Sequence, residues 1–274
     1  MARVLALSSH VAFGSVGLAA VVPALHWHGH ETLVVPTCVL SNHPGYAHIA
    51  GAPSPPLQIA GIVEALDANG WLADTAAVIT GYLPTPAHVA EALSAVERLR
   101  RANPKALYLC DPVMGDAPEG LYLSEATAEA IRDSLLPLAD ITTPNAFELQ
   151  WLTGIPVEQP AHVAAAAARV EVPTVLATSV IAPTNRLANI LAIEQAATAC
   201  YVTRRADAPH GSGDMLAAHF LGCILNGATR EAALAQAVGC VAASIEAAGD
   251  KGELPIADSC ELWASAPALT VDPL

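Results

Sequence analysis

The chain has 274 residues, 53% of them hydrophobic, and its 26 acidic against 12 basic residues give a formal net charge of −14. A chain this acidic repels the phosphates of nucleic acids and of anionic membranes, which argues against both as partners. The length and apolar content suffice for one sizeable core, and we expect a single domain over residues 1–274.

Short β-like segments alternate with longer helical segments along the chain. The predicted strands are residues 3–8, 32–38, 76–80, 106–110, 141–142 and 174–178. The predicted helices are residues 15–28, 55–69, 86–101, 145–151, 162–170, 213–225 and 230–247, and a hairpin is expected over 186–194 and 198–203. This alternation predicts an α/β fold with a mainly parallel sheet and helices on both faces.

Two segments near the start of the chain need a specific interpretation. The apolar residues 11–25 resemble part of a signal peptide, but two glycines and Pro23 make them too broken for a membrane span. We expect a glycine-rich turn there, followed by the first helix. The second helix should begin at Pro55, with Ser54 as its cap.

Six cysteines are scattered along the chain without a CxxC pair, as expected for reduced, mostly buried thiols of a cytoplasmic protein. They are Cys38, Cys110, Cys200, Cys223, Cys240 and Cys260.

Polar residues follow each of the six predicted strands. Because ligands of parallel sheets bind beyond the carboxyl ends of the strands, we expect these residues to form one rim of one cleft. They are Ser8-Ser9-His10, residues 41–46, Gly81-Tyr82, Asp111-Pro112, Thr143-Pro144-Asn145 and Thr178-Ser179.

The most informative motif is Gly211-Ser212-Gly213-Asp214, which directly precedes an apolar helix. The first N–H groups of a helix have no partner within the helix, and glycines let a phosphate approach them closely. Asp214 would repel a phosphate, so it is better suited as a base that takes a proton from an attacking hydroxyl group. The alternative is a glycine turn with an aspartate in the first turn of the helix.

Two further motifs place carboxylates at strand ends. Asp111 follows a predicted buried strand and could help to hold Mg²⁺ near phosphates, or it could be a solvated residue of a turn. Asn145 and Glu148 have the spacing of a capping box, which competes with a role for both in a metal and phosphate site.

Other motifs are weak or absent. His26, His28 and His30 lie close together, but no cysteine or carboxylate completes a zinc-ligand spacing. The sequence has no Walker-type phosphate loop, no GxSxG nucleophile motif and no dinucleotide-binding GxGxxG.

Taken in order, these motifs resemble those of pyridoxal kinases, within the ribokinase-like superfamily. The resemblance runs from Arg3 to Phe220 and is weak over the last fifty or so residues. It rests on Ser9-His10-Val11, residues 14–17, residues 41–46, Thr80-Gly81-Tyr82, residues 110–116, residues 142–148, Thr178-Ser179 and residues 211–214.

The resemblance implies a three-layer ribokinase-like fold with a reduced lid and a homodimer in the cytoplasm. It implies that ATP phosphorylates the 5′-hydroxymethyl group of pyridoxal, pyridoxine or pyridoxamine in vitamin B6 salvage. Mg²⁺ would accompany ATP, and whether a monovalent cation is also needed stays open.

The resemblance also implies roles for individual residues. Asp214 would be the base, and Gly211, Ser212 and Gly213 would form the anion hole with it. Ser9, Val16, His43 and Tyr82 would line the pyridine pocket, with Tyr82 packing on the ring. Asp111 and Glu148 would serve Mg²⁺, while Asp111, Asn145, Thr178 and Ser179 would serve the phosphates of ATP.

The sequence departs from the family pattern at Ser8, Leu40 and Pro44, where we expect glutamine, an aromatic residue and threonine. These positions lie near the ring pocket, so the preferred vitamer stays open, as do the adenine and ribose contacts. The nearest rival is hydroxymethylpyrimidine kinase of thiamine biosynthesis, which typically has cysteine where Asp214 stands and lacks the segment 41–46. A third interpretation is a non-catalytic vitamer carrier or regulator that kept the fold.

Overall fold

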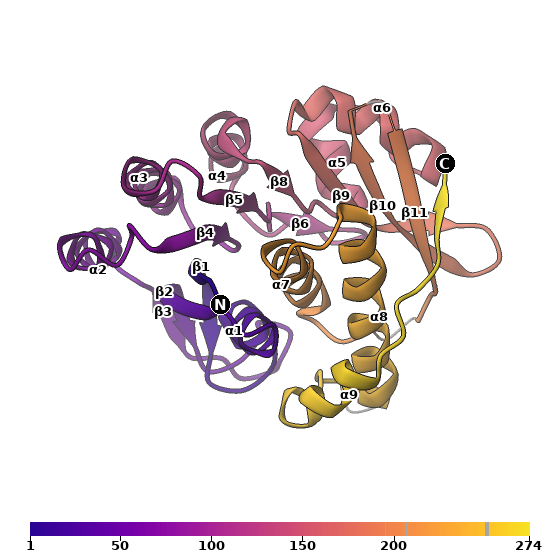
Figure 1. Cartoon of the computed structure of the whole chain (residues 1–274), viewed down its shortest axis with the longest axis horizontal. Helices are drawn as coiled ribbons and strands as arrows, with labels where there is room; N and C mark the ends of the chain where they lie inside the picture. Colours follow the sequence, from indigo (N-terminus) through magenta and orange to yellow (C-terminus); the bar gives the residue numbers. More distant parts are fainter. Residues whose placement is uncertain (195, 206–207, 250–251) are drawn as a thin grey trace.

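The computed structural model describes residues 1–194, 196–205, 208–249 and 252–274. Its centre is a ten-stranded sheet with the order β12-β11-β10-β9-β8-β5-β4-β1-β2-β3 (Figure 1). The strands are β1 (Arg3–Val11), β2 (Glu31–Leu40), β3 (Gly51–Pro53), β4 (Thr75–Thr80), β5 (Leu107–Cys110), β8 (Ile141–Thr142), β9 (Thr174–Ala182), β10 (Arg186–Ile193), β11 (Ala196–Thr203) and β12 (Val271–Pro273).

The middle of the sheet is parallel, as the alternation of strands and helices predicts. Strands β2, β1, β4, β5, β8 and β9 pair in parallel, whereas β3 and the group β10, β11 and β12 are antiparallel to their neighbours. Strand β1 lies between β2 and β4, so the strands that follow β1 in the sequence are added first on one side of it and then on the other. Such a switch point leaves a crevice at the carboxyl ends of the strands.

Helices cover both faces of the sheet and enclose two apolar cores (Figure 1). Side chains alternate along each strand, so Leu5 and Leu7 of β1 enter one core while Val4 and Ala6 enter the other. The first core lies under α2 (Pro56–Ala68), α3 (Pro86–Ala102), α4 (Glu125–Ala130), α5 (Ala146–Thr153) and α6 (Pro160–Val170). The second lies under α1 (Leu18–Trp27), α7 (Ser212–Leu225), α8 (Arg230–Ala248) and α9 (Ser259–Ser265). The predicted α/β class with helices on both faces is confirmed.

Several predicted boundaries were wrong; β9, for example, runs on to Ala182 instead of ending at residue 178. Helix α1 begins at Leu18 rather than at residue 15, because Gly14 and Gly17 adopt positive φ angles of 104° and 57° that a helix does not contain. Helix α2 begins at Pro56, and Ser54 does not cap it. The backbone N–H of Ser54 instead donates to the carbonyl of Thr37 (2.9 Å). Strand β1 continues three residues past Ser8, because it follows β2 through a register shift.

Short elements escaped the sequence analysis. They include the hairpin β6 (Gly115–Asp116) and β7 (Gly120–Leu121), the helical turns from Glu125 to Leu138, and strands β3 and β12. These strands have two or three residues and the helical pieces three to six, which is less than two periods of the strand or helix pattern, respectively, so periodicity does not reveal them.

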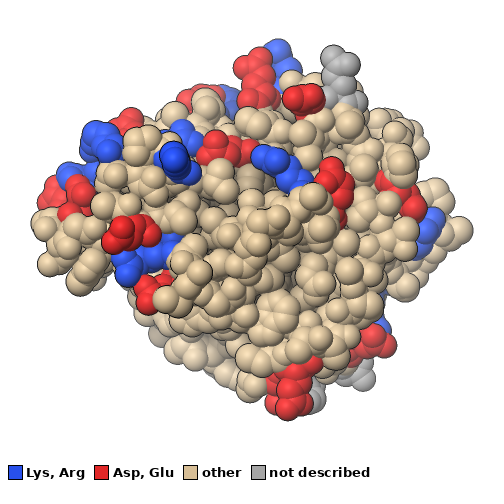
Figure 2. Space-filling view, in the orientation of Figure 1, with Lys and Arg blue, Asp and Glu red and all other residues tan. Residues whose placement is uncertain are grey.

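Helix α8 is long and apolar enough to cross a membrane by length and composition, but 56% of its apolar window is buried in the protein. It packs against α7 and the strands β10 and β11, which is the position of a core helix (Figure 1). On the face shown in Figure 2, several basic side chains lie beside acidic ones. Among the ion pairs of the described residues, Arg98 contacts both Glu64 and Asp67.

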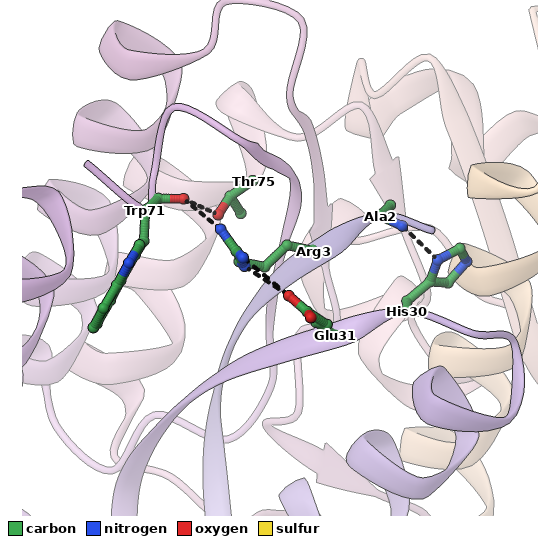
Figure 3. A network of polar contacts seen from close by, with 6 residues as sticks. All are labelled: Ala2, Arg3, His30, Glu31, Trp71 and Thr75. Atoms are coloured by element: carbon green, nitrogen blue, oxygen red, sulfur yellow. Dashed lines mark hydrogen bonds and ion pairs between the residues drawn. The ribbon is translucent and has the colours of Figure 1, made fainter. Parts of the chain in front are cut away.

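The amino ends of β1, β2 and β4 are joined by a network of polar contacts (Figure 3). Arg3 pairs with Glu31 at 3.0 Å, and a second nitrogen of Arg3 donates to the carbonyl of Trp71 (3.4 Å). The hydroxyl of Thr75 donates to the same carbonyl at 2.8 Å, and the backbone N–H of Ala2 donates to His30 at 3.3 Å. This network ties together three neighbouring strands at the end opposite the predicted cleft.

Candidate active site

The carboxyl ends of β1, β4 and β5 meet the start of α7 around one narrow recess. Ser8, Gly81, Asp111 and Asp214 line it together with apolar residues of β1, β4 and α1. These four residues come from four separate motifs of the sequence. The structure therefore brings together the central part of the predicted rim.

Asp214 lies in the first turn of α7, and its Oδ2 accepts a hydrogen bond from the backbone N–H of Gly17 (2.9 Å). Gly211 caps this helix with a φ of 87°, and a Cβ at this position would collide with the carbonyl of Ser15. The turn at residues 14–17 is thus pressed against the loop at residues 211–214. Asp214 therefore lines the recess from the first turn of α7, directly beside the turn at residues 14–17.

The carboxylates of the recess are poorly solvated. Burial raises the pKa of Asp214 to about 6, and the hydrogen bond from Gly17 opposes this shift. Burial and the negative charge of Asp214 raise the pKa of Asp111 to about 8. The hydroxyl of Thr143 donates to Asp111 Oδ1 at 2.8 Å, which orients this carboxylate and favours its charged form.

Glu148 is buried at the start of α5, where the capping box that the sequence left open is present. The side chain of Asn145 accepts from the N–H of Glu148 (2.9 Å), and Glu148 Oε2 accepts from the N–H of Asn145 (2.8 Å). Glu148 Oε1 also accepts from the N–H groups of Met114 (2.9 Å) and Gly115 (3.4 Å). Burial and the charge of Asp111 raise the pKa of Glu148 well above its usual value. Glu148 therefore fixes the turn that follows Asp111 and places a second buried carboxyl group beside it.

Two predicted pocket residues, Ser9 and Tyr82, lie on β1 and just after β4. Ser9 packs so closely against Gly17 that a Cβ on this glycine would collide with it. The backbone N–H of Tyr82 donates to Ser8 Oγ (3.1 Å), and its carbonyl accepts from the hydroxyl of Thr37 (2.6 Å). The half-buried side chain of Tyr82 packs against the core under α2 and α3. Ser8, where the family pattern led us to expect glutamine, thus holds the backbone that carries Tyr82.

His43 lies in the loop between β2 and β3 and meets the loop that precedes α7. Its ring stacks on that of His210, with centroids 3.8 Å apart and planes inclined by 19°. The N–H of Gly45 donates to its Nδ1 at 3.1 Å. Burial, followed by the effect of His210, lowers the pKa of His43. The sequence analysis missed His210, although it directly precedes Gly211.

The far side of the rim is formed at the end of β8 and in β9. The N–H of Thr178 donates to the carbonyl of Pro144 (2.9 Å), which holds β9 beside the turn that carries Asn145. Ser179 is exposed and has a φ of 58°, opposite a register shift in β10. A positive φ at a residue other than glycine costs free energy and is common where a backbone faces a ligand.

No group of three or more histidine, cysteine, aspartate and glutamate residues in the described ranges is arranged to hold a metal ion. The three neighbouring histidines have different partners: His26 contacts Thr32, His28 contacts His219, and His30 contacts the carbonyl of Gly222. The six cysteines are unpaired thiols, and all but Cys260 are buried.

Asp111 and Glu148 nevertheless fit Mg²⁺, which usually binds one or two protein carboxylates together with substrate phosphates and water. Both side chains are oxygen donors, and both are buried beside like charge that a cation would offset. The donor set is therefore compatible with a metal that enters with a nucleotide.

The comparisons with known proteins agree with this geometry. The family model described as phosphomethylpyrimidine kinase matches residues 14–256. A pyridoxal kinase PdxY of Corynebacterium diphtheriae is 36% identical over 267 residues, which cover 94% of each chain.

Solved structures show the same similarity. The pyridoxal kinase of Entamoeba histolytica superposes with a TM-score of 0.93 at 26% identity and full coverage of both chains. The pyridoxal kinase of Leishmania donovani in complex with ADP and pyridoxine gives a TM-score of 0.92 at 30% identity, with 99% of each chain covered. The ordered motifs, the recess that Asp111 and Asp214 share, and these relatives lead to one conclusion: the chain belongs to the pyridoxal kinase family of ribokinase-like enzymes.

Proposed function

We propose that this protein transfers the γ-phosphoryl group of ATP to the 5′-hydroxymethyl oxygen of pyridoxal, and also accepts pyridoxine and pyridoxamine. The observation that carries the proposal is the placement of Asp214, which shares one recess with Asp111 at the amino end of α7. The solved relative that binds ADP together with pyridoxine supports the same pair of substrates.

Asp214 acts as the base in this proposal. As the hydroxyl oxygen forms its bond to the γ-phosphorus, the bond from that phosphorus to the bridging oxygen of ADP breaks, and the proton passes to the carboxylate of Asp214. With a pKa of about 6 the carboxylate is mostly ionised at neutral pH. The N–H of Gly17 holds one of its oxygens, which leaves the other for the substrate.

The N–H groups at Gly211, Ser212 and Gly213 supply the anion hole for the moving phosphoryl group. This role suits a chain with few cations, because backbone N–H groups provide positive potential without lysine or arginine. On the nucleotide side, Thr178 and Ser179 contact the phosphates of ATP, and Asn145 orients the neighbouring turn through a bond from Nδ2 to the carbonyl of Gly115 (2.8 Å).

Asp111 and Glu148 would hold Mg²⁺ together with the phosphates of ATP. Bound there, the ion would offset the negative charge of the phosphates. Thr143 orients the carboxylate of Asp111, and the backbone N–H groups of residues 114, 115 and 145 hold that of Glu148. We leave a requirement for a monovalent cation open.

Ser9, Val16, His43 and Tyr82 line the ring pocket in this proposal. His43 covers this pocket from one side. The segment at residues 41–50, together with β3, forms the reduced lid of this proposal.

We further propose that residues 1–274 act as one cytoplasmic domain and that two copies form a homodimer. One continuous sheet and free thiols support the first two points. For the dimer, β3 covers only Cys38–Leu40 of β2, so the preceding part of β2 stays at the sheet edge with Val34 exposed. Light scattering at micromolar concentration should give twice the chain mass, and a monomer mass would contradict the dimer.

A turnover assay with ATP and pyridoxal tests the central proposal. Hydroxymethylpyrimidine should be assayed in parallel, because the matching family model carries the name of a pyrimidine kinase. We expect pyridoxal to be the better substrate. Turnover of the pyrimidine alone would favour thiamine biosynthesis, and pyridoxal binding without turnover would indicate a vitamer carrier.

A further inference from the structure

Two loops of the site converge on the carboxylate of Glu253, in the segment that follows α8. The hydroxyl of Tyr46 donates to Glu253 Oε1 (2.7 Å), and the backbone N–H of Ser15 donates to Glu253 Oε2 (3.1 Å). Tyr46 belongs to the same loop as His43. One carboxylate therefore joins three segments that are far apart in the sequence.

Ser15 is buried and held on two sides. Its hydroxyl donates to the carbonyl of Leu254 at 2.9 Å, next to the bond between its N–H and Glu253. Its own carbonyl lies against Gly211, where no side chain would fit. Two residues further on, the N–H of Gly17 binds Asp214. Residues 253 and 254 thus press the 14–17 turn onto the start of α7, where the base and the anion hole lie.

The segment at residues 41–46 is attached to the same assembly at two points. His43 stacks on His210, directly before the anion hole, and Tyr46 binds Glu253. The ring of Tyr46 also meets that of Phe13 edge to face, with centroids 6.2 Å apart. Tyr46 is 43% exposed, and its hydroxyl is held in place by the hydrogen bond to Glu253.

We propose that Glu253 is a positioning residue: its carboxylate holds the loop at residues 41–46, called the vitamer loop below, and the turn at residues 14–17, which binds Asp214, in one fixed arrangement. It does not touch the reacting atoms but acts through Ser15 and Tyr46. This inference rests on the proposed roles of Asp214 and of the anion hole.

The two bonds of Glu253 predict two separable effects. Losing the bond to Ser15 loosens the turn that holds Asp214, which lowers kcat, since small displacements of catalytic groups are costly. Losing the bond to Tyr46 frees the vitamer loop, which raises the KM for pyridoxal. Each bond has a charged acceptor, so we expect each effect to be about tenfold.

The variants Glu253→Ala, Glu253→Gln and Tyr46→Phe separate these effects. Glu253→Ala should lower kcat and raise the KM for pyridoxal, whereas Tyr46→Phe should raise this KM and leave kcat unchanged. Glu253→Gln should restore most of kcat, because its amide oxygen can still accept from Ser15 while its amide group donates to Tyr46. Glu261→Ala, at an exposed position on α9, is the matched control and should change neither constant.

Thermal melting shows which variants are folded at the assay temperature. A folded Glu253→Ala with wild-type kcat and KM overturns the proposal. If Glu253→Ala does not fold, Tyr46→Phe decides, because it removes one hydroxyl from an exposed residue. A raised KM for pyridoxal supports the proposal, and an unchanged KM overturns it. Asp214→Asn, assayed in parallel, tests the proposed function separately. If this variant keeps its turnover, the proposed role of Asp214 fails, whatever the Glu253 variants show.

Discussion

Among the described residues, charged side chains are paired at the amino ends of the parallel strands and unpaired at their carboxyl ends. At the amino ends, Arg3 and Glu31 form an ion pair, and the carbonyl of Trp71 accepts from Arg3 and Thr75 (Figure 3). At the carboxyl ends, Asp111 and Asp214 share one recess. No ion pair within the described part of the chain includes either of them.

This difference separates contacts that serve the fold from contacts that serve a ligand. Opposite charges that pair within the chain stabilise the folded state slightly, and neither partner is then available to bind a substrate. Carboxylates buried beside one another keep their pKa values high, because their charged forms lack a counter-charge. In the proposed function, a cation and a nucleotide would supply the missing positive charge and the ligand at the carboxyl end, whereas the ion pair at the amino end needs neither.

Removing divalent cations should have the largest effect on the function of the carboxyl end. We expect activity to vanish in excess EDTA and to return with Mg²⁺, because the chain has no P-loop lysine and its rim carries carboxylates instead. The measurement is turnover of pyridoxal with ATP before and after adding Mg²⁺. An unchanged melting temperature in EDTA would show that the amino-end network still holds the fold, and full activity in EDTA would contradict the metal assignment.

Asp214→Asn should lower turnover of pyridoxal by roughly 10²–10⁴-fold, which is the usual contribution of a positioned base. The amide can still accept from the N–H of Gly17, so the turn should keep its place. Binding of pyridoxal, measured by calorimetry, should change little. Glu31→Gln at the amino end is the control and should leave turnover unchanged, while a nearly normal Asp214→Asn would remove this residue from the mechanism.

Tyr82→Ala should raise the KM for pyridoxal by roughly tenfold, because a stacked ring contributes about 0.5–1.5 kcal/mol beyond its buried area. The KM for ATP should hardly change, since the nucleotide is proposed to lie across the cleft near Thr178. The effect should exceed that of Leu40→Ala. Equal effects on both substrates would show that the ring binds elsewhere.

Local motifs could be predicted from the sequence because neighbouring residues decide them. The strand Ile141–Thr142, the capping box of Asn145 and Glu148, and the glycine at the start of α7 all follow from side chains within a few positions. The rim followed from a general rule, since all carboxyl ends of a parallel sheet meet at one edge.

Contacts between distant segments could not be predicted in this way. Glu253 lies 238 residues from Ser15 and 207 from Tyr46, and no pattern in the sequence relates these positions. The extension of β1 past Ser8 depends on its pairing with β2, and the stacking of His43 on His210 depends on how two loops meet. Such features are set by the packing of the whole fold rather than by local propensity.

The smallest expected effect is at the amino end, where Arg3→Ala tests whether the network serves stability alone. The pair is partly exposed, with 26% of the Arg3 side chain and 55% of the Glu31 side chain accessible, so solvent screens it. Exposed pairs contribute about 0.2–1 kcal/mol, which corresponds to a melting shift of no more than about 4 °C in a protein of this size. The shift should shrink in 1 M salt, where the screening length falls to about 3 Å. Calorimetric melting measures it, and kcat should stay at the wild-type value because no contact of Arg3 reaches the opposite end of β1. A loss of turnover in a folded Arg3→Ala protein would mean that the two ends are coupled through the strand, and the separation between fold and function would then be wrong.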